Sequence, residues 1–95
     1  MSTSTAPTLP FVPSALVRQD LRVATFGFLL HRRENFTLVD AQARCRHLTG
    51  WAKTIADDVI KARLAEAPDR TLGGKEIAAA LYDAWSRLES GQHWR

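Results

Sequence analysis

The chain has 95 residues, of which 45% are hydrophobic and 24% charged, with a formal net charge of +3. A chain of this length folds as a single domain with a core of modest stability, so an elaborate active site would need residues from a partner. Its 13 basic residues are interleaved with 10 acidic ones, which favours an ordinary solvated surface over a nucleic-acid-binding stripe.

Residues 1–13 carry no charge and contain three of the four prolines. This composition predicts an extended or disordered arm, because proline removes backbone donors and few side chains are available to form a core. Leu9, Phe11 and Val12 could dock the arm onto a partner or onto the core. The arm has no basic region followed by a long apolar run, so we expect a cytoplasmic protein rather than an exported one.

The first predicted helix runs from Ser14, a plausible N-cap, to about Arg33. Apolar residues form two neighbouring stripes on it: Val17, Leu21, Ala24 and Phe28, and then Val23, Phe26 and Leu30. Gly27 in its interior costs about 1 kcal/mol relative to alanine, and a β-hairpin across residues 31–35 is the alternative. Three helices cannot cover both stripes, so we expect an exposed apolar patch used for association with another protein.

The second segment begins with Phe36 and Thr37, and Asp40 stands three residues after that threonine, a pattern typical of a helix start. Eight residues then alternate at spacings of three and four: Leu38, Ala41, Cys45, Leu48, Ala52, Ile55, Val59 and Ala62. This seam predicts one long helix that ends near Glu66, before Pro68. Gly50 lies off the seam and is either tolerated within the helix or marks a break.

The third predicted helix follows the loop PDRTLGG and ends before Gly91. Ile77, Leu81, Ala84 and Leu88 share one face of it, with Tyr82 and Trp85 beside them. We therefore expect an all-α fold: a small three-helix domain over residues 14–90 with one long central helix, an extended amino-terminal arm over 1–13 and a tail over 91–95.

Few residues suggest chemistry by this chain alone. Cys45 and His47 are two positions apart and would point to opposite sides of a helix, so we expect no metal site here. Cys45 lies on the seam and reads as a small buried hydrophobe, and a single cysteine excludes an internal disulfide. No serine has a nucleophile-elbow setting, and Gly73 and Gly74 are better explained as a loop before a helix than as a phosphate cradle.

Two sets of residues have both a structural and a functional explanation. Arg44 lies four residues after Asp40, so an ion pair on a solvated helix face is the simpler explanation for it. Alternatively, Arg44 or Arg46 projects into a partner subunit and donates a forked set of hydrogen bonds to an anionic or oxidised group. Tyr82 and Trp85 are likewise either core or interface aromatics, or the lining of a substrate pocket.

The stretches ATFGFLLHRRENFTLVDAQAR, residues 24–44, and LYDAWSRLES, residues 81–90, resemble a known family. They are similar to the amino-terminal helical half of nitrile hydratase beta subunits and to the small accessory proteins related to it. The positions that carry the resemblance are Phe36, Asp40, Arg44, Tyr82 and Trp85, together with the apolar stretch from Ala24 to Phe28.

The resemblance implies an alpha-type partner whose oxidised cysteine cluster holds cobalt or iron, and which hydrates nitriles to amides. It implies that this chain binds no cofactor itself, that Arg44 or Arg46 hydrogen-bonds the oxidised sulfurs, and that Phe36, Tyr82 and Trp85 line the pocket. The carboxy-terminal barrel half of a beta subunit does not follow in this sequence. That arrangement is similar to split-subunit nitrile hydratases and thiocyanate hydrolase, so a separate barrel-type beta half is a further expected partner.

Two other functions remain open from the sequence. One is an activator or metallochaperone that holds the alpha-type subunit while its metal is loaded. The other is a helical module that binds nucleic acid or a transcription factor, with TLGGKEIAAALYDAW as the second half of a helix-turn-helix. Lys75 and Arg87 are the only basic residues of that helix, which is too few for a phosphate footprint.

Overall fold

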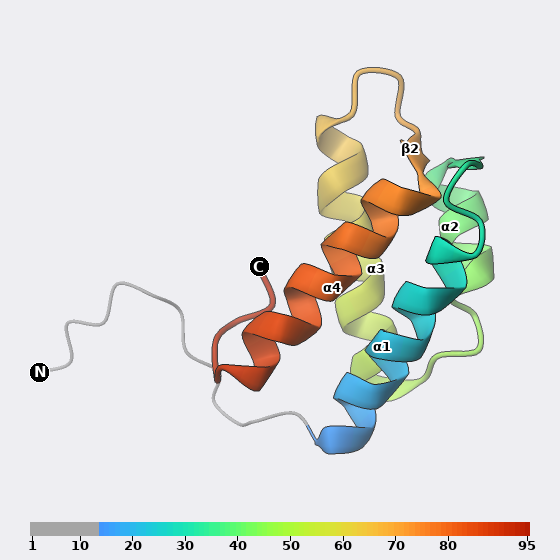
Figure 1. Ribbon diagram of the computed structural model, residues 1–95. Helices are drawn as coiled ribbons and strands as arrows, with labels where there is room; N and C mark the ends of the chain where they lie inside the picture. Colours follow the sequence, from blue (N-terminus) through green and yellow to red (C-terminus); the bar gives the residue numbers. More distant parts are fainter. Residues whose placement is uncertain (1–13) are drawn as a thin grey trace, which may run out of the picture.

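The computed structural model describes residues 14–95 as a bundle of three long helices and one short one (Figure 1). Its elements, in chain order, are α1 (Ala15–Leu29), β1 (Asn35–Phe36), α2 (Leu38–Arg44), α3 (Gly50–Glu66), β2 (Leu72–Gly73) and α4 (Gly74–Glu89). The expected all-α class is confirmed, because β1 and β2 form only a two-residue antiparallel bridge. The arm predicted for residues 1–13 lies outside the described residues.

Helix α1 starts where the sequence predicts and ends earlier. The Ser14 hydroxyl accepts a hydrogen bond from the Val17 backbone N–H, which confirms the predicted N-cap. The helix ends at Leu29 rather than near Arg33, and the chain continues as a tight turn in which the His31 N–H donates to the Phe28 carbonyl. The hairpin alternative is therefore wrong.

The long central helix expected over residues 38–66 is two helices. Helix α2 ends at Arg44, and α3 begins at Gly50, whose φ of +56° is a left-handed conformation that favours glycine. Thr37 is the cap of α2, as predicted, and accepts a hydrogen bond from the Asp40 N–H. Cys45 and Leu48 lie between the two helices and are still buried. The apolar spacing of three and four residues therefore shows which residues face the core, but it does not require one continuous helix.

We expect Gly50→Ala to lower the free energy of unfolding by about 1 kcal/mol, because a residue with a β-carbon is strained in a left-handed backbone conformation. A β-carbon at Gly50 would meet no atom within 4 Å, so the cost would come from the backbone alone. Gly27→Ala is the matched control: its β-carbon also has open space, and its helical backbone should make alanine stabilising by about 0.5–1 kcal/mol. Urea denaturation would show the two changes in opposite directions, and effects of the same sign would contradict this account.

Helix α4 is the element around which the others pack. In Figure 1 it runs alongside α1 and in front of α3. Its predicted stripe is completely buried. Its first residue, Gly74, lies against the end of α1, where its N–H donates to the Glu34 carbonyl at 2.8 Å. The largest fully buried side chains come from all the long helices and the turn after α2: Leu21, Ile55, Ile60, Ile77, Leu81, Leu88 and Cys45.

The predicted tail over residues 91–95 packs back on α3. The Trp94 indole N–H donates to Asp58 at 2.7 Å, and the Arg95 guanidinium lies 2.9 Å from the same carboxylate oxygen. The Trp94 ring also lies 5.8 Å from the ring of Trp51. Asp58 therefore anchors the end of the chain to α3.

Candidate functional site

Arg44 is held at the end of α2 by the loop that follows α1. Its Nη1 donates to His31 Nε2 at 3.1 Å, and its Nη2 lies 3.9 Å from the Glu34 carboxylate. Because Nε2 accepts this bond, the ring proton of the neutral imidazole is on Nδ1, which donates to Glu34 at 2.6 Å. The predicted pair with Asp40 is not formed. The Arg44 side chain remains 46% exposed, so its guanidinium is both oriented and accessible.

Phe36 fixes the same loop to the core. The residue is 3% exposed, and its ring meets Phe28 edge to face at 5.3 Å. Its backbone pairs with Leu72 of β2, which ties the two loops together. The Arg44 guanidinium carbon lies 5.8 Å from the ring centroid. The structure thus brings two of the predicted site residues together, one as a core anchor and the other at the surface.

Arg46 does not join this cluster. It lies in the turn after α2, beyond the end of the helix, and its side chain is exposed. Of the two arginines suggested by the sequence, Arg44 is therefore the one whose position is set by neighbouring side chains.

Tyr82 and Trp85 lie on the opposite flank of α1 from Arg44. Their rings meet edge to face at 4.8 Å, and the Arg22 guanidinium lies over Trp85 at 5.1 Å. Tyr82 is 55% exposed and lines a shallow apolar pocket between α1 and α4, whereas Arg44 lines a pocket between α1 and α2. The structure does not gather the three predicted pocket residues, Phe36, Tyr82 and Trp85, and Arg44 around one cavity.

The outer side of α1 carries an exposed apolar surface, formed by the predicted second stripe and one residue before it. We call this surface the α1 face and define it by Leu16, Val23, Phe26 and Leu30, which are 53–80% exposed. The first stripe faces the core instead, with Leu21, Ala24 and Phe28 buried and Val17 partly buried, because α4 packs on that side of the helix. The expected exposed apolar patch is therefore present.

A notch of about 140 Å³ borders the α1 face on the side of α2. Val23, Ala24, Gly27 and Phe28 form its apolar lining, and Arg44 and His47 supply its basic rim. We call it the α1–α2 notch. A β-carbon on Gly27 would meet no atom within 4 Å, so nothing in the described part of the chain requires glycine there.

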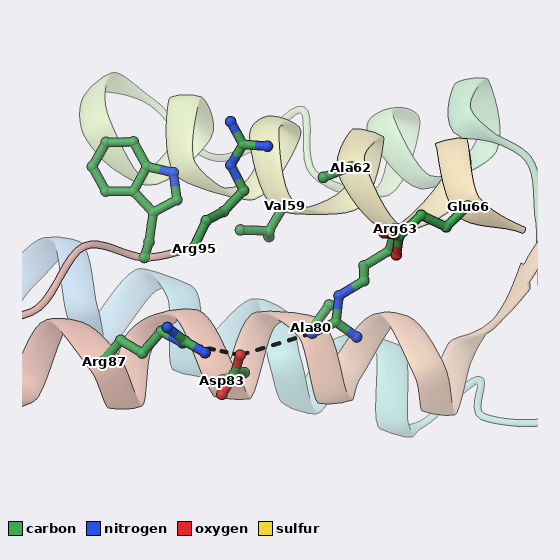
Figure 2. Close-up of a pocket in the computed structure, with 9 residues that line it drawn as sticks. Val59, Ala62, Arg63, Glu66, Ala80, Asp83, Arg87 and Arg95 are labelled. Carbon is green, nitrogen blue, oxygen red and sulfur yellow. Dashed lines mark hydrogen bonds and ion pairs between the residues drawn. The ribbon is translucent and has the colours of Figure 1, made fainter. Parts of the chain in front are cut away.

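A larger cleft of about 250 Å³ lies between α3, α4 and the end of the chain (Figure 2). Asp83 lies between two arginines there, 3.2 Å from Arg87 Nε and 3.8 Å from Arg63 Nη2. Arg95, the third arginine in the lining, is paired with Asp58. Because each guanidinium already has a carboxylate, the cleft is an ion-pair link between α3 and α4. Each pair is partly exposed and contributes at most about 1 kcal/mol.

Only one of the two ion pairs made by Asp83 can be predicted from the sequence. Asp83 and Arg87 are four residues apart on one helix and could be paired from the sequence, whereas Arg63 comes from a different helix. The pairing also occupies one of the two basic residues that a nucleic-acid-reading α4 would use.

Among residues 14–95, no group of three or more histidine, cysteine or acidic side chains could hold a metal ion. The loop before α4 shares one feature with a calcium-binding EF-hand loop, which has twelve residues, a sharp turn at its sixth and a glutamate at its twelfth. If Glu76 is taken as the twelfth residue, the sixth is Arg70, which has a positive φ of 59°. Counted this way, the first and third ligand positions are Ala65 and Ala67. The loop therefore lacks the oxygen ligands that such a site needs.

Burial raises the pKa of the Cys45 thiol from 9.0 to about 11, and the negative charge of Asp57 adds to the shift. The thiol is therefore protonated and inaccessible at neutral pH, and we expect a thiol reagent at pH 8 to label it only as fast as the protein opens. Because the unfolded thiol ionises near pH 9, the free energy of unfolding should fall between pH 9 and 11. Cys45→Ala should remove the part of this decrease in the free energy of unfolding that comes from the thiol. Rapid labelling of the native protein would contradict the buried position.

Comparison with known proteins does not place the chain in a family, since no family model, curated protein or solved structure matches it. Within the described part of the chain, no helix is long and apolar enough to cross a membrane. The candidate site therefore has to be interpreted from its own residues: the α1 face, the notch beside it and the oriented Arg44.

Proposed function

We propose that this chain is a non-catalytic helical subunit that docks on another protein through the α1 face. The observation that carries the proposal is the exposure of Leu16, Val23, Phe26 and Leu30 on one side of one helix. Single exposed apolar residues are common, but a continuous apolar helix face usually marks an interaction site. A domain of this size gains more from covering such a face than from leaving it in water.

The resemblance to nitrile hydratase beta subunits gives the partner: an alpha-type subunit that holds cobalt or iron in a cluster of oxidised cysteines. Arg44 supports this choice, because it lines the notch that borders the α1 face and its guanidinium is held by His31 and Glu34. A partner that covers the α1 face would bring one of its own loops close to Arg44. The planar guanidinium could then donate paired hydrogen bonds to oxidised sulfur.

In this proposal the metal belongs to the partner, where it activates water or the nitrile for hydration to an amide. This chain closes one side of the pocket and holds the oxidised cysteines through Arg44, with Arg46 as the second candidate. Phe36 keeps the Arg44 loop in place through its contact with Phe28. Tyr82 and Trp85 lie on the other flank of α1 and would contact a separate barrel-type beta half.

The test is to reconstitute hydratase activity from an alpha-type nitrile hydratase subunit, with and without this chain. If the chain is a subunit, activity should require it throughout and disappear when it is stripped from the metal-loaded complex. Activity that survives stripping would make the chain an activator, required only during metal loading. Full activity in a preparation that never contained the chain would contradict both versions.

A further inference from the structure

The α1 face has the spacing of a helix-pairing seam. Leu16, Val23 and Leu30 recur at seven-residue intervals, and Phe26 lies between the second and the third. Apolar residues at these intervals occupy the a and d positions of a heptad, which pack against a second helix. All four side chains are exposed, and no described element covers them.

We propose that a second copy of this chain covers the α1 face, with the two α1 helices packed antiparallel around a two-fold axis at Val23. Val23 is the midpoint between Leu16 and Leu30, so reversing the helix places each leucine opposite the other leucine of the second copy. Val23 meets Val23 at the axis. The surface is therefore self-complementary, as a two-fold interface requires.

Charge complementarity supports the same arrangement. Asp20 is exposed and has no ion pair within residues 14–95, and it lies on the side of α1 that carries Gly27. The antiparallel arrangement places Asp20 of one copy beside the α1–α2 notch of the other, whose rim is Arg44 and His47. This attraction occurs twice. In a parallel pair, Asp20 would lie two helical turns, roughly 10 Å, from Gly27 of either copy.

The two-fold arrangement also accounts for Gly27. Glycine in a helix interior is unfavourable, and the open space around this residue gives no reason for it within one copy. In the antiparallel pair, Gln19 of the second copy lies opposite Gly27. The absent side chain leaves room for that longer residue and lets the two backbones approach.

The α1 face is also the surface that the proposed function assigns to the alpha-type subunit. A second copy covers this face when the partner is absent, and in that role the dimer rests on the proposed function. The homodimer and the complex with the partner use the same side chains, so they exclude each other. Binding of the alpha-type subunit would therefore compete with dimerisation and lower the fraction of dimer.

The test is sedimentation velocity of the full chain alone, at concentrations from about 1 µM to about 1 mM, which bracket weak and moderate interfaces. We expect a reversible monomer–dimer equilibrium. Val23→Glu should raise the dissociation constant by at least about 100-fold, because it places two like charges at the axis. Val39→Glu is the matched control: Val39 is 74% exposed on α2, outside the α1 face, and this change should leave the equilibrium unaltered.

A charge exchange tests the antiparallel register. Asp20→Lys should weaken the dimer by about 10-fold, and adding His47→Glu should restore most of that loss. Circular dichroism would confirm that each variant keeps its helix content. A chain that stays monomeric over the whole range, a dimer insensitive to Val23→Glu, or a charge exchange that fails to restore the dimer would overturn the proposal. Because no partner is present, none of these results depends on the proposed hydratase subunit.

Discussion

Gly74→Ala is expected to lower the free energy of unfolding by about 3 kcal/mol, a large part of the total stability of a domain of this size. Gly74 is the first residue of α4 and lies directly against the end of α1. A β-carbon there would overlap the His31 carbonyl oxygen and come within 2.7 Å of the Phe28 carbonyl oxygen. Both atoms belong to the backbone, so the overlap can be relieved only if α1 and α4 move apart along the most extensive contact between two helices of the fold.

Gly73→Ala is the control for this prediction, since it adds the same methyl group one residue earlier. The nearest atom to a β-carbon at Gly73 is the Glu76 carboxylate, at the end of a flexible side chain that can rotate away. The φ of −68° at Gly73 suits any residue, so we expect a loss below about 1 kcal/mol. Urea denaturation followed by circular dichroism measures both variants. Equal losses would show that α1 and α4 do not meet as closely as described.

Arg44→Lys is expected to reduce nitrile hydration by the reconstituted complex by about 10- to 100-fold, the usual loss when a residue that orients a metal ligand is changed. Lysine keeps the positive charge but lacks the planar fork that would bind two oxygens of oxidised cysteine at once. It also cannot keep the same geometry toward His31 and Glu34. Helix content should not change, because the Arg44 side chain is half exposed.

Arg63→Lys is the matched control, because Arg63 is exposed to the same extent, also pairs with a carboxylate, and lies in the α3–α4 cleft away from the α1 face. Arg46→Lys distinguishes the two arginines that the sequence could not separate. If both Arg44→Lys and Arg46→Lys hydrate substrate as fast as the control, neither arginine acts on the metal centre. The chain would then be a scaffold or helper.

The apolar periodicity predicted most of the fold, because the spacing of buried residues reflects which side of each helix faces the core. The stripe from Ile77 to Leu88 and the cap at Thr37 were found as predicted. The break between α2 and α3 was not decided by the same signal. Cys45 and Leu48 stay buried through the turn, so the spacing of three and four continues where the helix does not.

The neighbours of Arg44 could not be predicted from the sequence, for a different reason. Local spacing pointed to Asp40, one helical turn away, whereas the actual neighbours His31 and Glu34 come from the loop on the other side of Phe36. That loop is placed by the contact of Phe36 with Phe28 and by the β1–β2 bridge. Similarly, the sequence showed two apolar stripes on α1, but only the packing of α4 determines which of them is left exposed.

If the α1 face is a docking surface for an alpha-type subunit, the two chains should form one complex when they are expressed together, and its mass can be measured. We predict that light scattering will show a stable complex of this chain with an alpha-type, cysteine-rich nitrile hydratase subunit. Phe26→Glu should abolish the complex, and Val39→Glu, which changes an exposed apolar residue on α2, should preserve it. A chain that elutes without that subunit at every ratio, or a complex that Phe26→Glu leaves intact, would contradict the account.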